Sequence, residues 1–287
     1  FCAIPSFKGK LHSRTLESLI KEVNILVKKG FKDFSFVSQD SSSYLRDLGH
    51  NDGLEQLIDA VEKIDGVKTA RILYLYPSTT TLNLIDKIAD SKVFVNYFDM
   101  PLQHISQNML KIMKRGKGAE KLIELMNYMK SKPNSFVRTT FIAGHPGESE
   151  EDFEELCSFV EEFGFDRGNV FSYSDEEGTS AETRDDKIEQ ELIDERAEIL
   201  GDIISQTTIK SLENDIGKSF EVYIDGESEE HEYLLSARKT IWAPQIDGEI
   251  YINDNEDNIP IIFGEIYEVE ATELAGDKLL AKIIRKV

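Results

Sequence analysis

Polar residues able to hold a ligand stand just after several apolar runs of this 287-residue chain. Gln39 and Asp40 follow one such run, Gln103 follows another, and Tyr173 follows a third. Amide, carboxylate and phenol groups form hydrogen bonds with amines, hydroxyls and ring nitrogens. A few such groups placed together therefore suit a small polar cofactor. Taken singly, each of them is more often a solvated strand end.

The stretch from Val137 to Ser149 offers a more specific site. Val137–Ala143 is β-branched and aromatic and predicts a buried strand, which Gly144 and Gly147 then interrupt. Ser149 with Asp152 gives a capping-box pattern at the start of a helix. A turn between a strand and a helix presents free backbone N–H groups, and without side chains it lets a ligand come close. An ordinary βα turn is the alternative.

The surrounding pattern indicates where these residues meet. We expect strands at 33–40, 70–76, 94–101, 137–143 and 168–173. We expect helices with apolar stripes at 16–27, 54–64, 82–89, 109–113, 122–129 and 150–163. Strands that alternate with helices predict a parallel sheet, open or closed into a barrel, whose carboxyl ends carry the chemistry.

The last third of the chain has a different pattern. A polar helix over 188–214 has its apolar stripe at Leu192, Ile199, Leu200 and Ile203, and it predicts a connector packed on the first domain. From Ile216 the apolar residues alternate, which predicts strands at 220–225, 233–235, 248–253, 266–271 and 279–284. Five short strands with turns between them predict a small antiparallel barrel. We therefore expect one domain over 1–214 and a second over 215–287.

Composition narrows the class of protein. The net charge of −21 disfavours broad binding to nucleic-acid phosphates and favours a basic partner or simple solubility. The only cysteines, Cys2 and Cys157, form no disulfide framework, which suits a reducing cytoplasm. No run approaches the roughly 18 apolar residues of a membrane span. Because the chain begins at Phe1 and not at a methionine, we interpret it as a fragment of a longer protein.

Several motifs taken together resemble the radical S-adenosylmethionine methylthiotransferases. They are Cys2-Ala-Ile-Pro5, Ser38-Gln-Asp40, Pro101-Leu-Gln-His104, Met113-Lys-Arg115, Arg138-Thr-Thr-Phe-Ile-Ala-Gly-His-Pro-Gly-Glu148 and Phe171-Ser-Tyr-Ser-Asp-Glu-Glu-Gly-Thr179. The resemblance covers the whole length, since the C-terminal β domain is similar to a TRAM domain. It implies an α/β fold: a partial TIM-like (βα)6 radical SAM barrel, its first strand upstream of Phe1, followed by a small antiparallel, TRAM-like β-barrel.

The resemblance also implies two cofactors, a [4Fe–4S] cluster and S-adenosyl-L-methionine, with a second cluster in the N-terminal domain of the complete enzyme. Cys2 would be the third ligand of a CxxxCxxC motif whose other cysteines lie upstream, so the fragment alone should be inactive. A lone cysteine is otherwise far more often a small buried residue. In the family, the reduced cluster cleaves S-adenosylmethionine to a radical that abstracts hydrogen from an unactivated carbon. We expect Cys2 at the mouth of the barrel.

By position, the resemblance implies cofactor contacts at or near the strand ends and leaves the catalytic residues unknown. The implied contacts are Gln39, Asp40, Gln103, Arg138, Gly144, Gly147, Glu148 and Tyr173. Arg138 would pair with the methionine carboxylate through its planar fork, and a salt bridge inside the barrel mouth is the alternative. The Gly144–Gly147 turn would let backbone approach the adenosine, and Tyr173 would flank the adenine.

The family divides by substrate. Cys2-Ala-Ile-Pro and Gln39-Asp40 resemble the branch that adds a methylthio group to an aspartate of the twelfth ribosomal protein of the small subunit. Residues 215–287 hold 17 acidic and seven basic side chains, a net of −10, which predicts docking to a basic ribosomal protein, possibly on the ribosome, and makes direct tRNA binding unfavourable. The alternatives are a solvated acidic surface, a tRNA methylthiotransferase acting on a modified adenosine, and a non-enzymatic binding scaffold.

Overall fold

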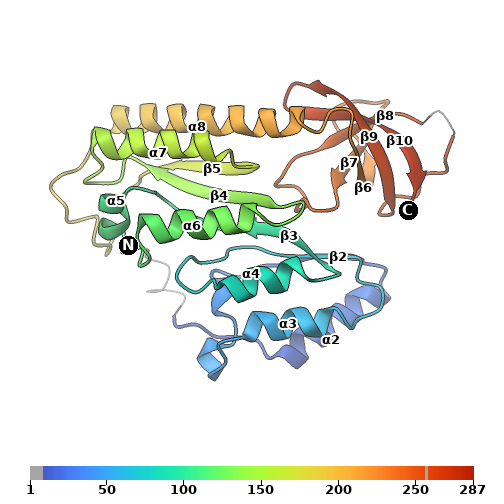
Figure 1. Ribbon diagram of the computed structural model, residues 1–287, viewed down its shortest axis with the longest axis horizontal. Helices are drawn as coiled ribbons and strands as arrows, with labels where there is room; N and C mark the ends of the chain where they lie inside the picture. Colours follow the sequence, from blue (N-terminus) through green and yellow to red (C-terminus); the bar gives the residue numbers. More distant parts are fainter. Residues whose placement is uncertain (1–8, 256–257) are drawn as a thin grey trace. The chain divides into compact units, whose positions relative to one another are not determined.

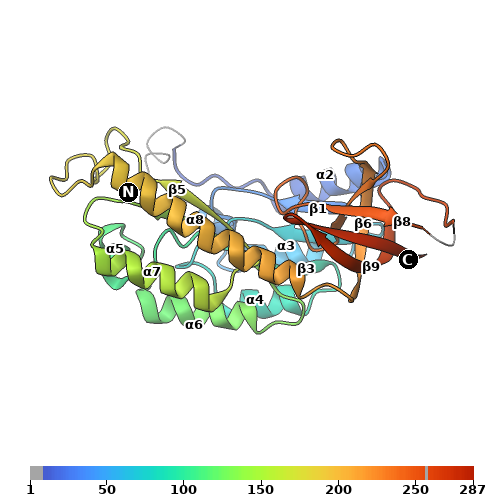
Figure 2. The same ribbon diagram turned by 90° about the horizontal axis from the view of Figure 1, so that it is seen from above.

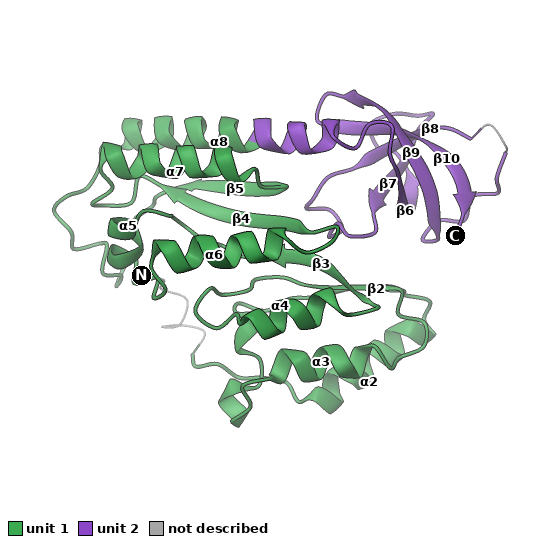
Figure 3. Cartoon of the chain, in the orientation of Figure 1, with its two compact units in different colours: residues 1–204 green, residues 205–287 purple. Residues whose placement is uncertain are grey.

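The computed structural model describes residues 9–255 and 258–287. Cys2, the predicted cluster ligand, lies outside the described residues. The chain forms two compact units, residues 1–204 and 205–287 (Figure 3). Helix α8 (Gln190–Glu213) contributes to both. The domain boundary predicted between residues 214 and 215 stays a prediction.

The first unit is a parallel five-stranded sheet whose strand order equals the order along the chain (Figure 1). The strands are β1 (Asp33–Phe36), β2 (Thr69–Ile72), β3 (Phe94–Asp99), β4 (Phe136–Ala143) and β5 (Arg167–Ser172). The helices are α2 (Leu16–Lys28), α3 (Gly53–Val61), α4 (Leu82–Ala89), α5 (Gln107–Ile112), α6 (Ala119–Lys130) and α7 (Glu150–Phe163), with 3-10 turns η1 (Ser41–Ser43) and η2 (Arg46–Leu48). The predicted alternation and parallel sheet are confirmed.

Side-chain caps explain why several helices begin where they do. The Thr15 hydroxyl accepts from the Ser18 N–H at the start of α2. The predicted capping box of α7 is confirmed, because Ser149 and Asp152 each accept from the other's backbone N–H. A cap of this kind satisfies N–H groups that the first turn leaves without helical partners. The start of α7 is therefore fixed directly after the glycine-containing turn.

The two faces of the sheet differ in character. The helices cover one face, where Phe98, Val137 and Phe141 belong to the apolar core (Figures 1 and 2). Because side chains alternate along a strand, Asp99 and Arg138 point to the opposite face. This alternation gives the sheet an apolar side for packing and a polar side on which charged pairs form.

The carboxyl ends of the strands do not lie at one level. Register pairs Phe36 with Ile72, at the ends of β1 and β2, and Asp99, at the end of β3, with Arg138. Strand β4 continues beside β5 to Ala143. Such stagger is what a curling sheet requires. The residues that follow β4 therefore stand farther along the strand direction than those that follow β1 to β3.

The second unit holds a closed five-stranded barrel with strand order β10-β8-β7-β6-β9. Its strands are β6 (Ser219–Glu227), β7 (Leu235–Lys239), β8 (Ile250–Asp254), β9 (Ile266–Ala275) and β10 (Lys278–Lys286). The predicted fold class, a half-barrel sheet followed by a small β-barrel, is confirmed. One pairing differs from the all-antiparallel expectation, since β10 and β8 run parallel where the barrel closes.

The apolar stripe predicted for the long helix is partly wrong. Leu200 is buried, but Leu192 and Ile199 are 38% and 42% exposed. The buried positions in the part of α8 that belongs to the first unit are Ile193, Arg196, Leu200 and Ile204. Their spacing of three and four residues is helical, and it includes an arginine that an apolar count leaves out. No helix in the described part of the chain is long and apolar enough to cross a membrane.

Candidate cofactor site

The turn between β4 and α7 is shaped by two glycines with left-handed backbone. Gly144 has a φ of +79° and Gly147 a φ of +89°, values that favour glycine. A Cβ on Gly144 would lie 2.6 Å from the Ile193 side chain, so α8 approaches the turn too closely for any larger residue. A Cβ on Gly147 would lie 2.8 Å from the Arg184 guanidinium. Backbone conformation favours glycine at both positions, and the lack of space adds to this at Gly144.

Glu148 closes this turn from inside. Its side chain is fully buried, and the Gly144 N–H donates to Oε1 at 3.1 Å and to Oε2 at 3.0 Å. Arg196 of α8 donates from Nη1 to Oε1 at 2.9 Å. A buried carboxylate is stable only when it is paired and hydrogen-bonded, and Glu148 meets both conditions. Its oxygens therefore accept hydrogen bonds from the turn and from Arg196.

Two buried histidines flank Glu148. The Ser106 N–H donates to Nδ1 of His104, so the proton of the neutral ring is on Nε2, which lies 3.6 Å from Oε2 of Glu148. His145 places Nδ1 2.9 Å from the Pro146 carbonyl oxygen, an acceptor, so its Nδ1 carries the proton. Burial lowers the pKa of His145. Each ring is thus oriented by one hydrogen bond through its Nδ1.

Tyr173 stands beside the same turn at the end of β5. Its N–H donates to the Ala143 carbonyl at 2.9 Å, and its ring meets the His145 ring edge-on at a centroid distance of 5.0 Å. Its hydroxyl donates to Asp175 at 2.6 Å, and burial together with that hydrogen bond raises the pKa of Tyr173. A cavity of about 480 Å³ opens here, lined by Pro146, Tyr173, Asp175 and neighbouring residues of the β5–α8 connection.

Gln103 joins this group through its backbone. Its N–H donates to the Thr140 carbonyl at 2.8 Å, and its own carbonyl accepts from the Ile142 N–H at 2.9 Å. It has a φ of +70°, an uncommon conformation for a residue with a side chain, at the point where β3 leads into α5. The structure therefore brings Gln103, Gly144, Gly147, Glu148 and Tyr173 together along β4 and its turn.

Arg138 does not belong to that group. It is the third residue of β4, and an extended chain of six residues places it roughly 20 Å before Gly144. Its Nη1 donates to Oδ1 of Asp99 at 3.0 Å, and Oδ2 of Asp99 accepts from the Tyr74 N–H at 3.0 Å. Burial raises the pKa of Asp99, against the opposing effect of Arg138. The salt bridge that we weighed as an alternative for Arg138 is present.

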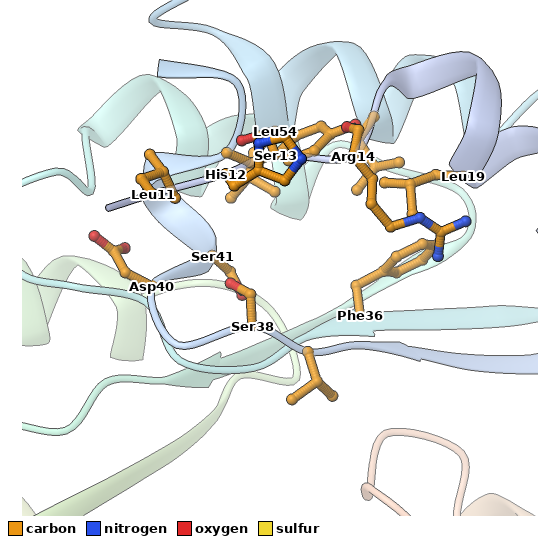
Figure 4. A pocket seen from close by; sticks show the side chains of 13 residues that line it. Leu11, His12, Ser13, Arg14, Leu19, Phe36, Ser38, Asp40, Ser41 and Leu54 are labelled. Carbon is orange, nitrogen blue, oxygen red and sulfur yellow. The ribbon is translucent and has the colours of Figure 1, made fainter. Parts of the chain in front are cut away.

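Gln39 and Asp40 lie at a third place, after β1. Gln39 is exposed, and the Asp40 carboxylate accepts from the hydroxyls of Ser42 at 2.7 Å and Ser43 at 2.5 Å. Asp40 also lines a cavity of about 260 Å³ between the end of β1 and the segment 11–14 (Figure 4). Its lining is largely apolar, with Leu11, Leu19 and Phe36 among the residues that Figure 4 labels.

Arg196 is the residue of this site that sequence reasoning missed. It lies in a polar helix, where one more arginine gives no signal. The sequence places His104 and Asp99 at strand ends, but it predicted no role in the site for either residue. Within residues 9–255 and 258–287, no group of three or more His, Cys, Asp or Glu side chains is arranged to hold a metal ion. The predicted ligand Cys2 lies outside those ranges.

A family model described as the radical SAM superfamily matches residues 1–160, more than half of the chain. The chain belongs to this superfamily. A TRAM domain model matches residues 216–284, which include all of the β-barrel of the second unit except the last two residues of β10. The Gly144–Glu148 turn lies inside the radical SAM match, and Tyr173 and Arg196 lie beyond its end.

Two relatives of this radical SAM chain carry the name ribosomal protein uS12 methylthiotransferase RimO. The protein of Aliarcobacter butzleri is 79% identical over 287 residues, and that of a Sulfurovum species is 62% identical over 286 residues. The chain is aligned over 99% and 100% of its own length, and it spans 64% and 65% of these relatives.

A solved radical SAM enzyme has a fold similar to part of this chain. Coproporphyrinogen III oxidase (HemN) from Escherichia coli, a radical SAM enzyme, aligns with a TM-score of 0.50 over 69% of this chain and 45% of its own. The two sequences are 16% identical in that alignment. The likeness concerns the fold alone.

Proposed function

We propose that the protein to which this chain belongs is a radical SAM methylthiotransferase that adds a methylthio group to an aspartate of ribosomal protein uS12. The observation that carries the proposal is the 79% identity, over 287 residues, with a relative named as the uS12 methylthiotransferase RimO. At that identity the fold of both units is expected to be shared. The enzyme class and the substrate rest on this likeness.

The residues around the β4–α7 turn fit S-adenosylmethionine. Gly144 and Gly147 leave the turn without side chains, so an adenosine can approach its backbone. The cavity beside Tyr173 has about 480 Å³ and both apolar and polar walls, as a nucleoside requires. Bound there next to a reduced [4Fe–4S] cluster, S-adenosylmethionine supplies the one-electron chemistry that activates a carbon–hydrogen bond.

In this proposal, residues of this chain bind and orient S-adenosylmethionine. Tyr173 flanks the base, and Gln103 faces the cofactor from the β3 side of the turn. Arg138 lies apart from the turn, with Asp99 fixing one side of its guanidinium, and its pairing with the methionine carboxylate stays a prediction. Gln39 and Asp40 contact the cofactor or the substrate from the end of β1. Cys2 holds the cluster together with two cysteines upstream of Phe1, and the number of clusters in the whole protein stays a prediction.

Glu148 has a different role in this proposal. Its carboxylate already accepts from Gly144 and Arg196, and His104 lies beside it. We therefore propose that Glu148 contributes to cofactor binding by shaping the turn, so that the Gly144–Gly147 backbone keeps the conformation that the adenosine needs. This is a narrower role than a direct contact, and it is the one that its burial supports.

The acidic β-barrel is proposed as the surface that takes the basic ribosomal protein. In the run from Asp225 to Glu232, two charges are paired within the unit: Asp225 with Arg238, and Glu230 with Lys278. The exposed side chains of Glu227, Glu229 and Glu232 form no ion pair within the described part of the chain. Beside them Tyr233 is 90% exposed. A basic partner fits this charge, and an RNA backbone does not.

Mass spectrometry of uS12 from cells with and without the gene tests the proposal. We expect one aspartate of uS12 to carry a methylthio group in the parent strain and to lack it in the deletion strain, with full recovery on complementation by the intact gene. An unchanged uS12, together with loss of a methylthio group from tRNA, would replace this function by the tRNA-modifying one. Absence of cysteines at the two expected upstream positions would favour a binding scaffold.

A further inference from the structure

Arg196 is a buried cation on α8, a helix whose other charged side chains in the first unit are exposed. It is 4% exposed, and its guanidinium packs 5.1 Å from the centre of the Phe153 ring. Nη1 donates to the Glu148 carboxylate at 2.9 Å and to the Glu148 carbonyl at 3.1 Å. Nη2 donates to the Glu150 carboxylate at 2.8 Å. The guanidinium thus holds the last residue of the turn and the first residue of α7 at once.

The same contacts continue to Gly144. The carboxylate that Arg196 holds accepts the Gly144 N–H through both oxygens. One helical turn earlier, Ile193 occupies the space next to Gly144 that a Cβ would need. Helix α8 therefore contacts the turn at two points. Ile193 packs against Gly144 at the start of the turn, and Arg196 forms an ion pair with Glu148 at the end of the turn. The two contacts lie at opposite ends of the turn.

We propose that Arg196 is a positioning residue for cofactor binding. It fixes the Glu148 carboxylate, the carboxylate fixes the Gly144 N–H, and the turn is thereby preformed for the adenosine. Arg196 itself touches no cofactor atom. The proposal rests on the proposed function, since it presumes that S-adenosylmethionine occupies this turn.

Two physical arguments favour positioning over a purely stabilising role. A buried ion pair is seldom more stabilising than apolar side chains of similar volume, so stability alone does not account for the pair. A planar guanidinium fixes direction as well as distance, because its donors point along set lines. A site whose backbone is already ordered loses less conformational entropy when the ligand binds.

Three single variants of the full-length protein test the proposal. Arg196→Met removes the charge and keeps the volume. Arg196→Lys keeps the charge and loses the fork. Lys130→Met is the control at the opposite end of α7, where the exposed Lys130 of α6 donates to the Phe163 and Gly164 carbonyls. Hydrogen exchange of the cofactor-free protein is followed in peptides covering residues 141–149, and S-adenosylmethionine affinity is measured by calorimetry on the reconstituted enzyme.

We expect Arg196→Met to speed exchange in 141–149 by at least tenfold and to weaken S-adenosylmethionine binding by at least tenfold. Arg196→Lys should lie between this variant and the wild type, and Lys130→Met should match the wild type in both measurements. Unchanged exchange after Arg196→Met, or equal acceleration by Lys130→Met, would overturn the proposal. Faster exchange with unchanged affinity would overturn it as well, because the cofactor would then not need the preformed turn.

A fourth variant covers the case in which Arg196→Met does not fold. The double variant Glu148→Gln, Arg196→Met leaves no uncompensated buried charge, since Glu150 is exposed, and we expect it to fold with fast exchange and weakened affinity. Wild-type exchange and affinity in the double variant would contradict the proposal. If the wild type itself fails to bind S-adenosylmethionine, the proposed function is wrong and the positioning role falls with it, although the exchange data still report whether Arg196 holds the turn.

Discussion

The Gly144–Glu148 turn and the Asp225–Glu232 run both have carboxylates near the end of a strand. The two regions differ in how far those carboxylates are exposed to solvent. Glu148 is buried and meets Arg196, Gly144 and His104. In the acidic run, Glu227, Glu229 and Glu232 are exposed. A buried charge demands partners at set distances, so it fixes local geometry. An exposed charge acts through a screened field over about a Debye length, so it fixes little geometry and attracts from afar.

The largest effect expected from this comparison is the loss of the buried carboxylate. Glu148→Ala leaves Arg196 without its buried partner, and we expect it to lower the free energy of unfolding by about 3–5 kcal/mol, measured by denaturant titration. Glu150→Ala is the control, because Glu150 pairs with the same arginine but is 66% exposed at its side chain. It should cost less than about 1 kcal/mol. Equal losses in the two variants would show that burial does not distinguish them.

The next effect concerns the backbone of the turn. Gly144→Ala meets both a left-handed φ and the Ile193 side chain, so we expect a loss of more than about 2 kcal/mol of unfolding free energy. Gly164→Ala is the control at the other end of α7: its φ is also positive, but its nearest neighbour lies 3.6 Å from the added Cβ. It should lose only the strain, about 1–2 kcal/mol. A smaller loss at Gly144 than at Gly164 would contradict the close approach of α8.

A smaller effect is expected at the ion pair between Arg138 and Asp99. Arg138→Lys keeps the charge and loses the planar fork, so we expect S-adenosylmethionine affinity of the full-length enzyme to fall about tenfold, which corresponds to about 1.4 kcal/mol. Calorimetry on the reconstituted enzyme measures it. Unchanged affinity would mean that Arg138 serves Asp99 or the substrate and does not bind the cofactor.

The smallest effect on stability is expected in the acidic run. Glu→Gln changes at 227, 229 and 232 together should alter the unfolding free energy by no more than about 0.5 kcal/mol, because these side chains are exposed. They should nevertheless slow association with uS12 and flatten its salt dependence, since exposed charge acts mainly on the on-rate. Surface plasmon resonance at low and moderate salt checks both. Wild-type on-rates and salt slopes in the triple variant would mean that this run is only a solvated acidic surface.

The turn itself was open to prediction from the sequence, whereas the contacts that hold it were not. A β-branched run, two glycines and a Ser–Asp capping pattern each have a local physical cause, so the strand, the turn and the start of α7 followed from residues a few positions apart. Arg196 lies 48 positions from Glu148, and nothing in its neighbours marks it. A charge that is buried by a distant partner carries no local signal.

The same limit explains Arg138 and the long helix. Arg138 opens a strand motif that also contains the turn, but strand stagger sets it beside Asp99 at the end of β3. Stagger depends on how neighbouring strands pair, and one strand's sequence does not report it. In α8 the buried stripe passes through Arg196, so a count of apolar residues selected Leu192 and Ile199, which are exposed. Local periodicity fixes the type of element more reliably than it fixes which face is buried.

We propose that the full-length protein modifies a protein substrate, uS12, and not tRNA. The most direct test presents the full-length, anaerobically reconstituted enzyme with S-adenosylmethionine, a reductant, a sulfide source and equimolar uS12 and tRNA, and analyses both by mass spectrometry. We predict a methylthio group on one aspartate of uS12 and an unmodified tRNA. A methylthiolated adenosine in the tRNA with unmodified uS12 would contradict this substrate assignment.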